Sequence, residues 1–249
     1  MSAASPSSRP TLSAMILAGG HSTRMGQDKA LLRLPSGQTL LSQTVEVVRS
    51  LTPDIKIVTP WPEKYQSSAF QSSASQSSAS QSSASQSSVS AGVPPADVEW
   101  VKEPLPKHPL PTRERQKSSA GPLSGFGLGW AQVSSDWCLL LACDLPYLEA
   151  AALQDWWDWI IANQQNGWPG LEHPMASLSP MEGPYDSQRW EPLCGYYHRS
   201  CIHSLQCHIG LGQCSFQDWL SAVTVVSYEA APKRLFFNCN WPSEWPFGQ

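Results

Sequence analysis

The stretch that decides the fold is Met15-Ile-Leu-Ala-Gly-Gly-His-Ser-Thr-Arg-Met-Gly-Gln-Asp-Lys29, in which a short apolar segment runs directly into a glycine-rich loop. A polyphosphate needs backbone N–H groups at close range, which favours residues without a Cβ, and it needs fixed cations. An ordinary strand-to-helix turn also accommodates glycines, but cations at fixed offsets favour a phosphate-binding loop. The glycines and cations of this loop are Gly19, Gly20, Gly26, Arg24 and Lys29.

Within this stretch, the pattern Leu17-Ala-Gly-Gly-x-Ser-x-Arg-Met-Gly-x-Asp-Lys29 resembles the signature of the molybdenum cofactor guanylyltransferases, which belong to the wider nucleotidyltransferase superfamily. It differs from the Walker A loop, in which Gly-Lys is followed directly by Ser or Thr, and from the dinucleotide fingerprint, which requires no lysine. Leu-Ala-Gly-Gly together with Asp28-Lys29 is similar to the guanylyl branch, whereas cytidylyl relatives tend to carry Leu-Ala-Ala-Gly.

Length and charge exclude several classes of protein. The chain has 249 residues, 41% of them hydrophobic, which is enough for a buried core. Its formal net charge is −4, from 16 basic and 20 acidic residues, so no overall positive field attracts a nucleic acid backbone. The longest apolar run, Trp137–Cys143, falls far short of the ~20 residues that a membrane helix requires. We therefore expect neither nucleic acid nor a membrane among the partners.

The amino-terminal residues and the cysteines favour a cytoplasmic protein. Residues 1–10 are rich in Ser and Pro and lack the apolar core of a signal peptide. Seven cysteines form no Cys-x-x-Cys pair, and a chain of this size does not depend on disulfides. Near the carboxyl end, a Cys/His cluster is an alternative metal site, although its spacings match no standard zinc pattern and an ordinary helix also explains it. The cluster consists of Cys194, His198, Cys201, His203, Cys207, His208 and Cys214.

Strand and helix patterns alternate along the chain. The predicted strands after the first loop are Ile55–Thr59, Asp97–Val101, Trp137–Ala142, Met175–Leu178, Pro192–Tyr197 and Val223–Ser227. The predicted helices are 40–51, the glycine-rich 121–133, one from Leu148 onward, 199–208 and 216–220. Such alternation implies parallel pairing. With the resemblance, it predicts a single-domain α/β fold with a mostly parallel, doubly wound, Rossmann-like sheet of the nucleotidyltransferase type.

The expected domain, 13–249, follows a disordered tail, 1–12, and is interrupted by two atypical segments. The first is a low-complexity insertion, 66–92, which repeats Gln-Ser-Ser-Ala-Ser and has side chains too small and polar to offset the entropy of ordering them. The second is a Pro-rich, basic loop, 102–119, longer than the corresponding connection in the family. Its cations at 107–117 are either solvated or fold over the binding crevice and contact an anionic substrate or an acceptor protein.

Asp144 is the predicted metal ligand. It directly follows the buried strand Trp137–Ala142, and open α/β sheets bind ligands beyond the carboxyl ends of their strands. A single aspartate suffices for Mg²⁺ when nucleotide phosphates complete the shell. The alternative is that Asp144 caps a helix beginning near Leu148. The resemblance favours the metal, because Asp-x-Pro after this strand matches the family's magnesium-binding position.

The resemblance also implies a set of nucleotide contacts. Three positions depart from the family pattern: Thr59 stands where an asparagine is usual, Glu103 where an aspartate is usual, and Trp241 where threonine follows Asn-x-Asn. The asparagines Asn238 and Asn240 could equally serve turn chemistry. The implied binding residues are Leu17, Ala18, Gly19, Gly20, Lys29, Glu103, Asp144, Asn238 and Asn240, and the implied catalytic residues are Arg24, Lys29 and Asp144.

The reaction implied by the resemblance is transfer of GMP from GTP to the molybdenum-bound molybdopterin, with Mg²⁺ as cofactor and release of pyrophosphate. Phosphoryl-type transfer asks a protein chiefly for alignment and charge neutralisation, so no nucleophilic side chain is needed. Molybdoenzyme acceptors or cofactor-delivery proteins are the further partners implied. The alternatives are a cytidylyl or sugar-phosphate nucleotidyltransferase and a non-catalytic nucleotide-binding module.

Overall fold

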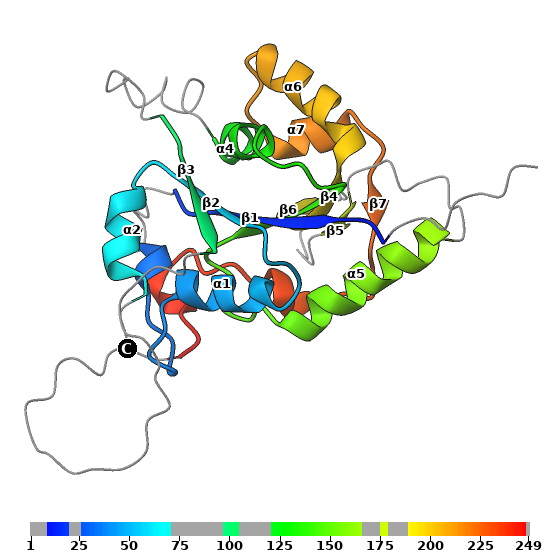
Figure 1. The fold of residues 1–249 in the computed structure, drawn as a ribbon. Coiled ribbons are helices and arrows are strands. Elements are labelled where there is room, and N and C mark those ends of the chain that lie inside the picture. The colour runs from blue at the N-terminus through cyan, green and yellow to red at the C-terminus, as the bar shows by residue number, and fades with distance from the viewer. Residues whose placement is uncertain are drawn as a thin grey trace, which may run out of the picture.

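A seven-stranded sheet forms the centre of the computed structural model, with the strand order β3-β2-β1-β4-β6-β5-β7 in the described part of the chain (Figure 1). The structure describes residues 9–19, 26–70, 97–104, 121–165, 175–178 and 189–247. The strands are β1 Leu12–Leu17, β2 Ile55–Thr59, β3 Val98–Lys102, β4 Trp137–Ala142, β5 Met175–Leu178, β6 Trp190–His198 and β7 Val226–Ser227.

The direction of the strands confirms the predicted, mostly parallel sheet. β1 pairs in parallel with β2 and β4, β2 pairs in parallel with β3, and β5 pairs in parallel with β7. β6 is antiparallel to both of its neighbours, β4 and β5. β5 and β6 follow each other in the chain, and an antiparallel pair needs no crossover helix between its strands.

Helices cover both faces of the sheet. α1 and α5 lie on one face, and α4, α6 and α7 lie on the other (Figure 1). This arrangement confirms the doubly wound architecture. The helices are α1 Leu40–Arg49, α2 Pro62–Ser68, α4 Pro122–Trp130, α5 Ala150–Gln165, α6 Ile202–Gly210 and α7 Phe216–Ser221, and the 3₁₀ turns are η1 Lys29–Leu31, η3 Arg199–Cys201, η4 Lys233–Phe236 and η5 Pro242–Glu244.

Alternate residues of the central strands feed two separate cores. On β1, Ala14 and Ile16 pack in the core beneath α1 and α5, whereas Met15 packs in the core beneath α4 and α6. All three side chains are fully buried. This alternation follows from the period of two in a strand, and burial on both faces explains why β4 reads as a continuous apolar run.

Several boundaries differ from the sequence-based expectations: β7 begins at Val226 and not at Val223, α5 begins at Ala150 and not at Leu148, and two further differences concern the tail and the insertion. Thr11 and Leu12 belong to the fold and not to a tail, because Leu12 begins β1 and the Thr11 hydroxyl donates to Asp136 Oδ2 at 2.7 Å. In addition, α2 extends to Ser68, so the first residues of the predicted insertion 66–92 are helical. The rest of that insertion from residue 71, and 105–119 of the basic loop, lie outside the described residues.

In the described ranges, no helix combines the length and the apolar character that crossing a membrane requires.

Candidate active site

The carboxyl ends of β1 and β4 lie side by side and carry the first loop and Asp144. Cys143 N–H donates to Leu17 O at 3.3 Å, and Ala18 N–H donates to Val58 O at 3.0 Å. These backbone bonds extend the parallel pairing past the ends of the strands. The sheet therefore fixes the start of the glycine-rich loop beside Cys143, and Asp144 is the next residue in the chain.

Lys29 joins three segments that are far apart in sequence. Its Nζ donates to Asp144 Oδ2 at 2.9 Å and to Asn240 Oδ1 at 2.8 Å. The side chains of Lys29 and Asp144 are only 16% and 14% exposed. The predicted convergence of the first loop and Asp144 on one place is thus present in the structure, and Asn240 is part of it.

A short 3₁₀ turn, η1, presents Lys29. Asp28 caps this turn, because its Oδ1 accepts a hydrogen bond from Ala30 N–H at 3.0 Å. Gly26 precedes it with φ of +69°, a left-handed conformation that L side chains rarely adopt. The end of the loop therefore needs glycine at position 26 and a cap at position 28 to aim Lys29 at Asp144.

Asp144 does not cap a helix, so that alternative is wrong. α5 begins at Ala150, well beyond Asp144. Instead, Asp144 Oδ2 accepts from Lys29, and Asp144 Oδ1 is buried with no hydrogen-bond partner among the described residues. A buried, orphaned carboxylate oxygen is costly unless something binds it, and hard divalent cations prefer such oxygen donors. The residue therefore fits a Mg²⁺ ligand.

Glu103 lies between two glycines at the neighbouring end of β3. A Cβ added to Gly19 would lie 3.5 Å from Glu103 Oε2, and one added to Gly125 would lie 3.6 Å from Oε1. Burial raises the pKa of Glu103 to about 7. Glu103 therefore reaches the end of β1 and the first turn of α4, and its role at the nucleotide site stays a prediction.

The carboxyl-terminal asparagines lie beside Asp144. Cys239 N–H approaches Asp144 O at 3.5 Å, which holds this segment against the end of β4. Asn240 takes part both in the candidate site and in a turn. Its side chain accepts a hydrogen bond from Lys29, and its backbone N–H donates to Glu244 Oε2 at 2.6 Å. Asn238 Oδ1 is buried, and no group in the described ranges donates a hydrogen bond to it.

Other predicted positions contribute less or lie outside the described residues. Thr59 is fully buried, and its hydroxyl accepts from Trp61 N–H at 3.2 Å, so it stabilises the turn after β2. Gly20, Arg24 and the basic segment 107–117 lie outside the described residues. Their predicted roles stay predictions.

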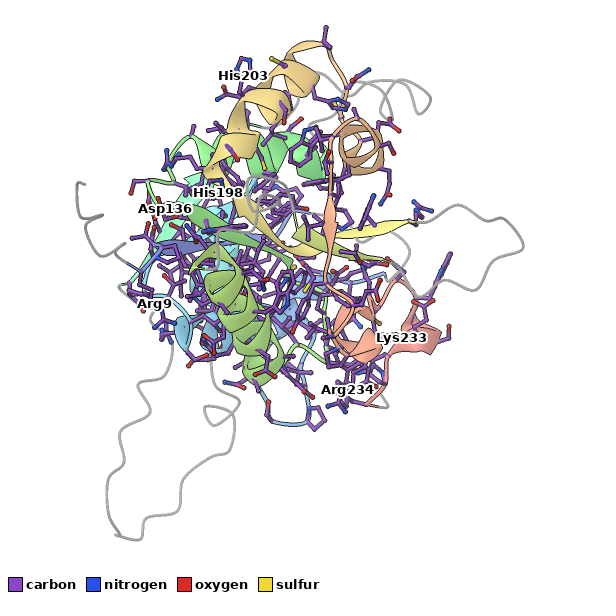
Figure 2. All side chains as sticks on the ribbon, turned by 90° about the vertical axis from the view of Figure 1, so that its right-hand side faces the viewer. Arg9, Asp136, His198, His203, Lys233 and Arg234 are labelled. Atoms are coloured by element: carbon purple, nitrogen blue, oxygen red, sulfur yellow. The ribbon has the colours of Figure 1, made fainter. Side chains whose placement is uncertain are left out.

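The Cys/His cluster near the carboxyl end does not form a metal site in the described ranges, where no group of three or more suitable ligands was found. Cys194 is buried in β6. Figure 2 shows His198 at the end of β6 and His203 well away from it on α6. His203 contacts Cys207, one turn further along the same helix, with Nε2 and Sγ 3.7 Å apart, so the ordinary helix explains the pattern.

The sequence did not predict α2 or the residues that it adds to the site. Tyr65 OH donates to Asp28 Oδ2 at 2.9 Å, and Lys64 Nζ pairs with the same oxygen. A signal for this helix was present, since Pro62 directly follows the β2 turn and Pro is favoured at the first helical position. The adjacent repeat obscured it.

An open α/β sheet with a glycine-rich loop after its first strand and a carboxylate beyond the neighbouring strand defines the nucleotide-binding α/β class. A family model described as the MobA-like NTP transferase domain matches residues 14–223. The chain belongs to this family.

Relatives and a solved structure agree with this assignment. Two proteins, from a Nostoc species and from Synechococcus elongatus, are each named probable molybdenum cofactor guanylyltransferase and are 34% identical to the chain. The alignments cover 94% and 93% of the chain and 88% and 95% of the relatives. The molybdopterin-guanine dinucleotide biosynthesis protein A of Archaeoglobus fulgidus has a similar fold, with a TM-score of 0.54, 17% identity and coverage of 93% and 94%.

Proposed function

We propose that the protein transfers GMP from GTP to the molybdenum-bound molybdopterin, forming molybdopterin guanine dinucleotide and releasing pyrophosphate. The observation that carries the proposal is the 2.9 Å contact between Lys29 and Asp144, which are 115 residues apart in sequence. The first loop's similarity to the guanylyl branch and the names of the relatives support the choice of GTP.

In this reaction, an oxygen of the acceptor's terminal phosphate forms a bond to the α-phosphorus of GTP, and the bond from that phosphorus to the bridging β-oxygen breaks. Lys29 would neutralise the charge that builds on the phosphate oxygens, and the backbone amides of Gly19 and Gly20 would position the nucleotide. Glu103, between Gly19 and Gly125, would bind the nucleoside from the β3 side.

Asp144 would hold the Mg²⁺ ion through Oδ1, the oxygen that the described residues leave without a hydrogen bond. Bound there, Mg²⁺ supplies positive charge to the phosphate oxygens. Calorimetry tests this role without turnover: GTP binding should be strengthened by Mg²⁺ in the unmodified protein, and Asp144→Asn should remove most of that dependence. Equal Mg²⁺ dependence in both proteins would contradict the assignment.

The test of the function is an assay of pyrophosphate release with Mg²⁺, the molybdenum-bound pterin and each nucleoside triphosphate in turn. We expect release with GTP and not with CTP, ATP or UTP. Release with CTP would instead indicate a cytidylyltransferase. Tight GTP binding without release in the presence of the acceptor would indicate a nucleotide-binding module.

A further inference from the structure

The carboxylate of Asp28 uses its two oxygens for different purposes. Oδ1 caps the turn that carries Lys29, by accepting from Ala30 N–H at 3.0 Å. Oδ2 accepts from Tyr65 OH at 2.9 Å and pairs with Lys64 Nζ. Both of these donors come from α2, so a single side chain links the turn of Lys29 to a helix elsewhere in the fold.

Tyr65 is the rigid end of this link. Its side chain is 1% exposed and packs in the core beneath α1 and α5. Burial, together with the neighbouring carboxylate of Asp28, raises the pKa of Tyr65 far above its usual range, so the hydroxyl keeps its proton and donates. Lys64 is 46% exposed and lies 5.4 Å from the Tyr65 ring centroid, so it is the looser of the two donors.

Lys29 directly follows Asp28 as the first residue of the turn, and its ammonium meets two acceptors. Its Nζ has to reach Asp144 Oδ2 and Asn240 Oδ1 at 2.9 and 2.8 Å, from a turn of only three residues. Small displacements of a catalytic group are costly, since a shift of about 1 Å can lower a rate by up to ~100-fold. The anchor of Asp28 on α2 is therefore in a position to set where the Lys29 ammonium lies.

We propose that Tyr65 is a positioning residue for Lys29: it holds Asp28, Asp28 holds the turn, and the turn aims the ammonium at the phosphates. Lys64 supports the same carboxylate more weakly. This inference rests on the proposed function for the role of Lys29 in turnover, but the geometric part of it can be measured without turnover.

The first experiment measures how exposed Lys29 is. Both proteins, unmodified and Tyr65→Phe, are treated with a limiting amount of an amine-acetylating reagent, and the rate at each lysine is followed by peptide mass spectrometry. We expect Lys29 to react severalfold faster in Tyr65→Phe, while Lys233, an exposed lysine on η4, reacts at an unchanged rate. An unchanged rate at Lys29 would overturn the proposal whether or not the protein is a transferase.

The second experiment measures turnover with GTP. Removing the Tyr65 hydroxyl should lower kcat about tenfold and leave the KM for GTP within about twofold, because the loss concerns the transition state. Lys64→Met should have a smaller effect. Tyr197→Phe is the matched control. Tyr197 is also fully buried, and its hydroxyl donates to the backbone oxygen of Pro192 at 2.7 Å. This hydrogen bond does not involve Lys29.

A double substitution separates positioning from general stability. If Tyr65 acts through Lys29, adding Tyr65→Phe to Lys29→Ala should not slow the enzyme further. Multiplicative losses, or an equal loss in Tyr197→Phe, would overturn the proposal. Faster acetylation of Lys29 without any pyrophosphate release from the unmodified protein would support the anchor and contradict the proposed function alone.

Discussion

The amino ends and the carboxyl ends of the parallel strands form two opposite edges of the sheet, here called the amino edge and the carboxyl edge. The two edges use polar side chains in opposite ways. At the amino edge, buried Lys56 pairs with Asp54 at 3.2 Å and Glu99 at 2.5 Å, and Thr11 is hydrogen-bonded to Asp136. The hydrogen bonds from Thr11 hold the pKa of Asp136 below its usual range. At this edge the named carboxylates are satisfied by neighbouring protein groups.

At the carboxyl edge, polar oxygens are left over. In the part of the chain that the structure describes, Asp144 Oδ1 and Asn238 Oδ1 are buried without a hydrogen-bond partner, and burial accounts for the raised pKa of Glu103. Unsatisfied buried oxygens reduce stability, and a ligand that supplies a cation or a hydrogen-bond donor would complete these two. The comparison teaches that the amino edge serves stability and the carboxyl edge serves binding.

The largest expected effect is at Lys29 and Asp144. Lys29→Ala and Asp144→Ala should each lower kcat roughly a thousandfold, because charge neutralisation at the phosphates is lost, while both variants still melt cooperatively. Pyrophosphate release and circular dichroism measure the two properties. Lys233→Ala is the control, since Lys233 is an exposed cation on η4, labelled in Figure 2, and should keep normal turnover. Near-normal turnover in either active-site variant would contradict the proposal that the carboxyl edge serves binding and catalysis.

Much of this contrast could be predicted from sequence, because the relevant signals are local. The apolar run of β4 ends at Ala142, as expected, and Asp144 follows it. Lys29 lies at a fixed offset from the glycines of the first loop. The carboxyl ends of parallel strands meet at one edge, so local patterns and one topological rule are enough to bring these residues together.

The parts that could not be predicted depend on tertiary contacts. To predict the hydrogen bond from Tyr65 to Asp28, one must know that α2 packs beside Asp28, and nothing in the spacing of these residues shows that. The position of Asn240 near Lys29 likewise depends on how the carboxyl-terminal segment folds back. The antiparallel direction of β6 is set by its pairing with β4 and β5, not by its composition.

An intermediate effect is expected at the amino edge, on stability and not on turnover. Asp54→Ala leaves buried Lys56 with one carboxylate fewer and removes a partner of the buried Ser13 hydroxyl, so it should cost about 2 kcal/mol in the free energy of unfolding. Urea denaturation measures this cost. Asp97→Ala, which removes an exposed partner of Arg49, should cost less than about 1 kcal/mol. If kcat of Asp54→Ala falls at urea concentrations below its unfolding midpoint, the amino and carboxyl edges of the sheet are coupled.

The smallest effect concerns Glu103 and depends on pH. Its pKa is raised to about 7 by burial, so the folded protein holds a proton that the unfolded chain releases near pH 4.5. Stability from this group is therefore complete below about pH 4.5 and is lost as pH rises through about 7. Glu103→Gln, which cannot ionise, should match the unmodified protein in urea denaturation at pH 4.5 and exceed it by about 1 kcal/mol at pH 8, a figure reduced for partial solvent screening. Glu229→Gln, at an exposed carboxylate, should change the free energy of unfolding by the same amount at pH 4.5 and at pH 8. A pH-independent difference for Glu103→Gln would mean that its carboxylate is satisfied by the protein, and the contrast between the edges would then rest on Asp144 and Asn238.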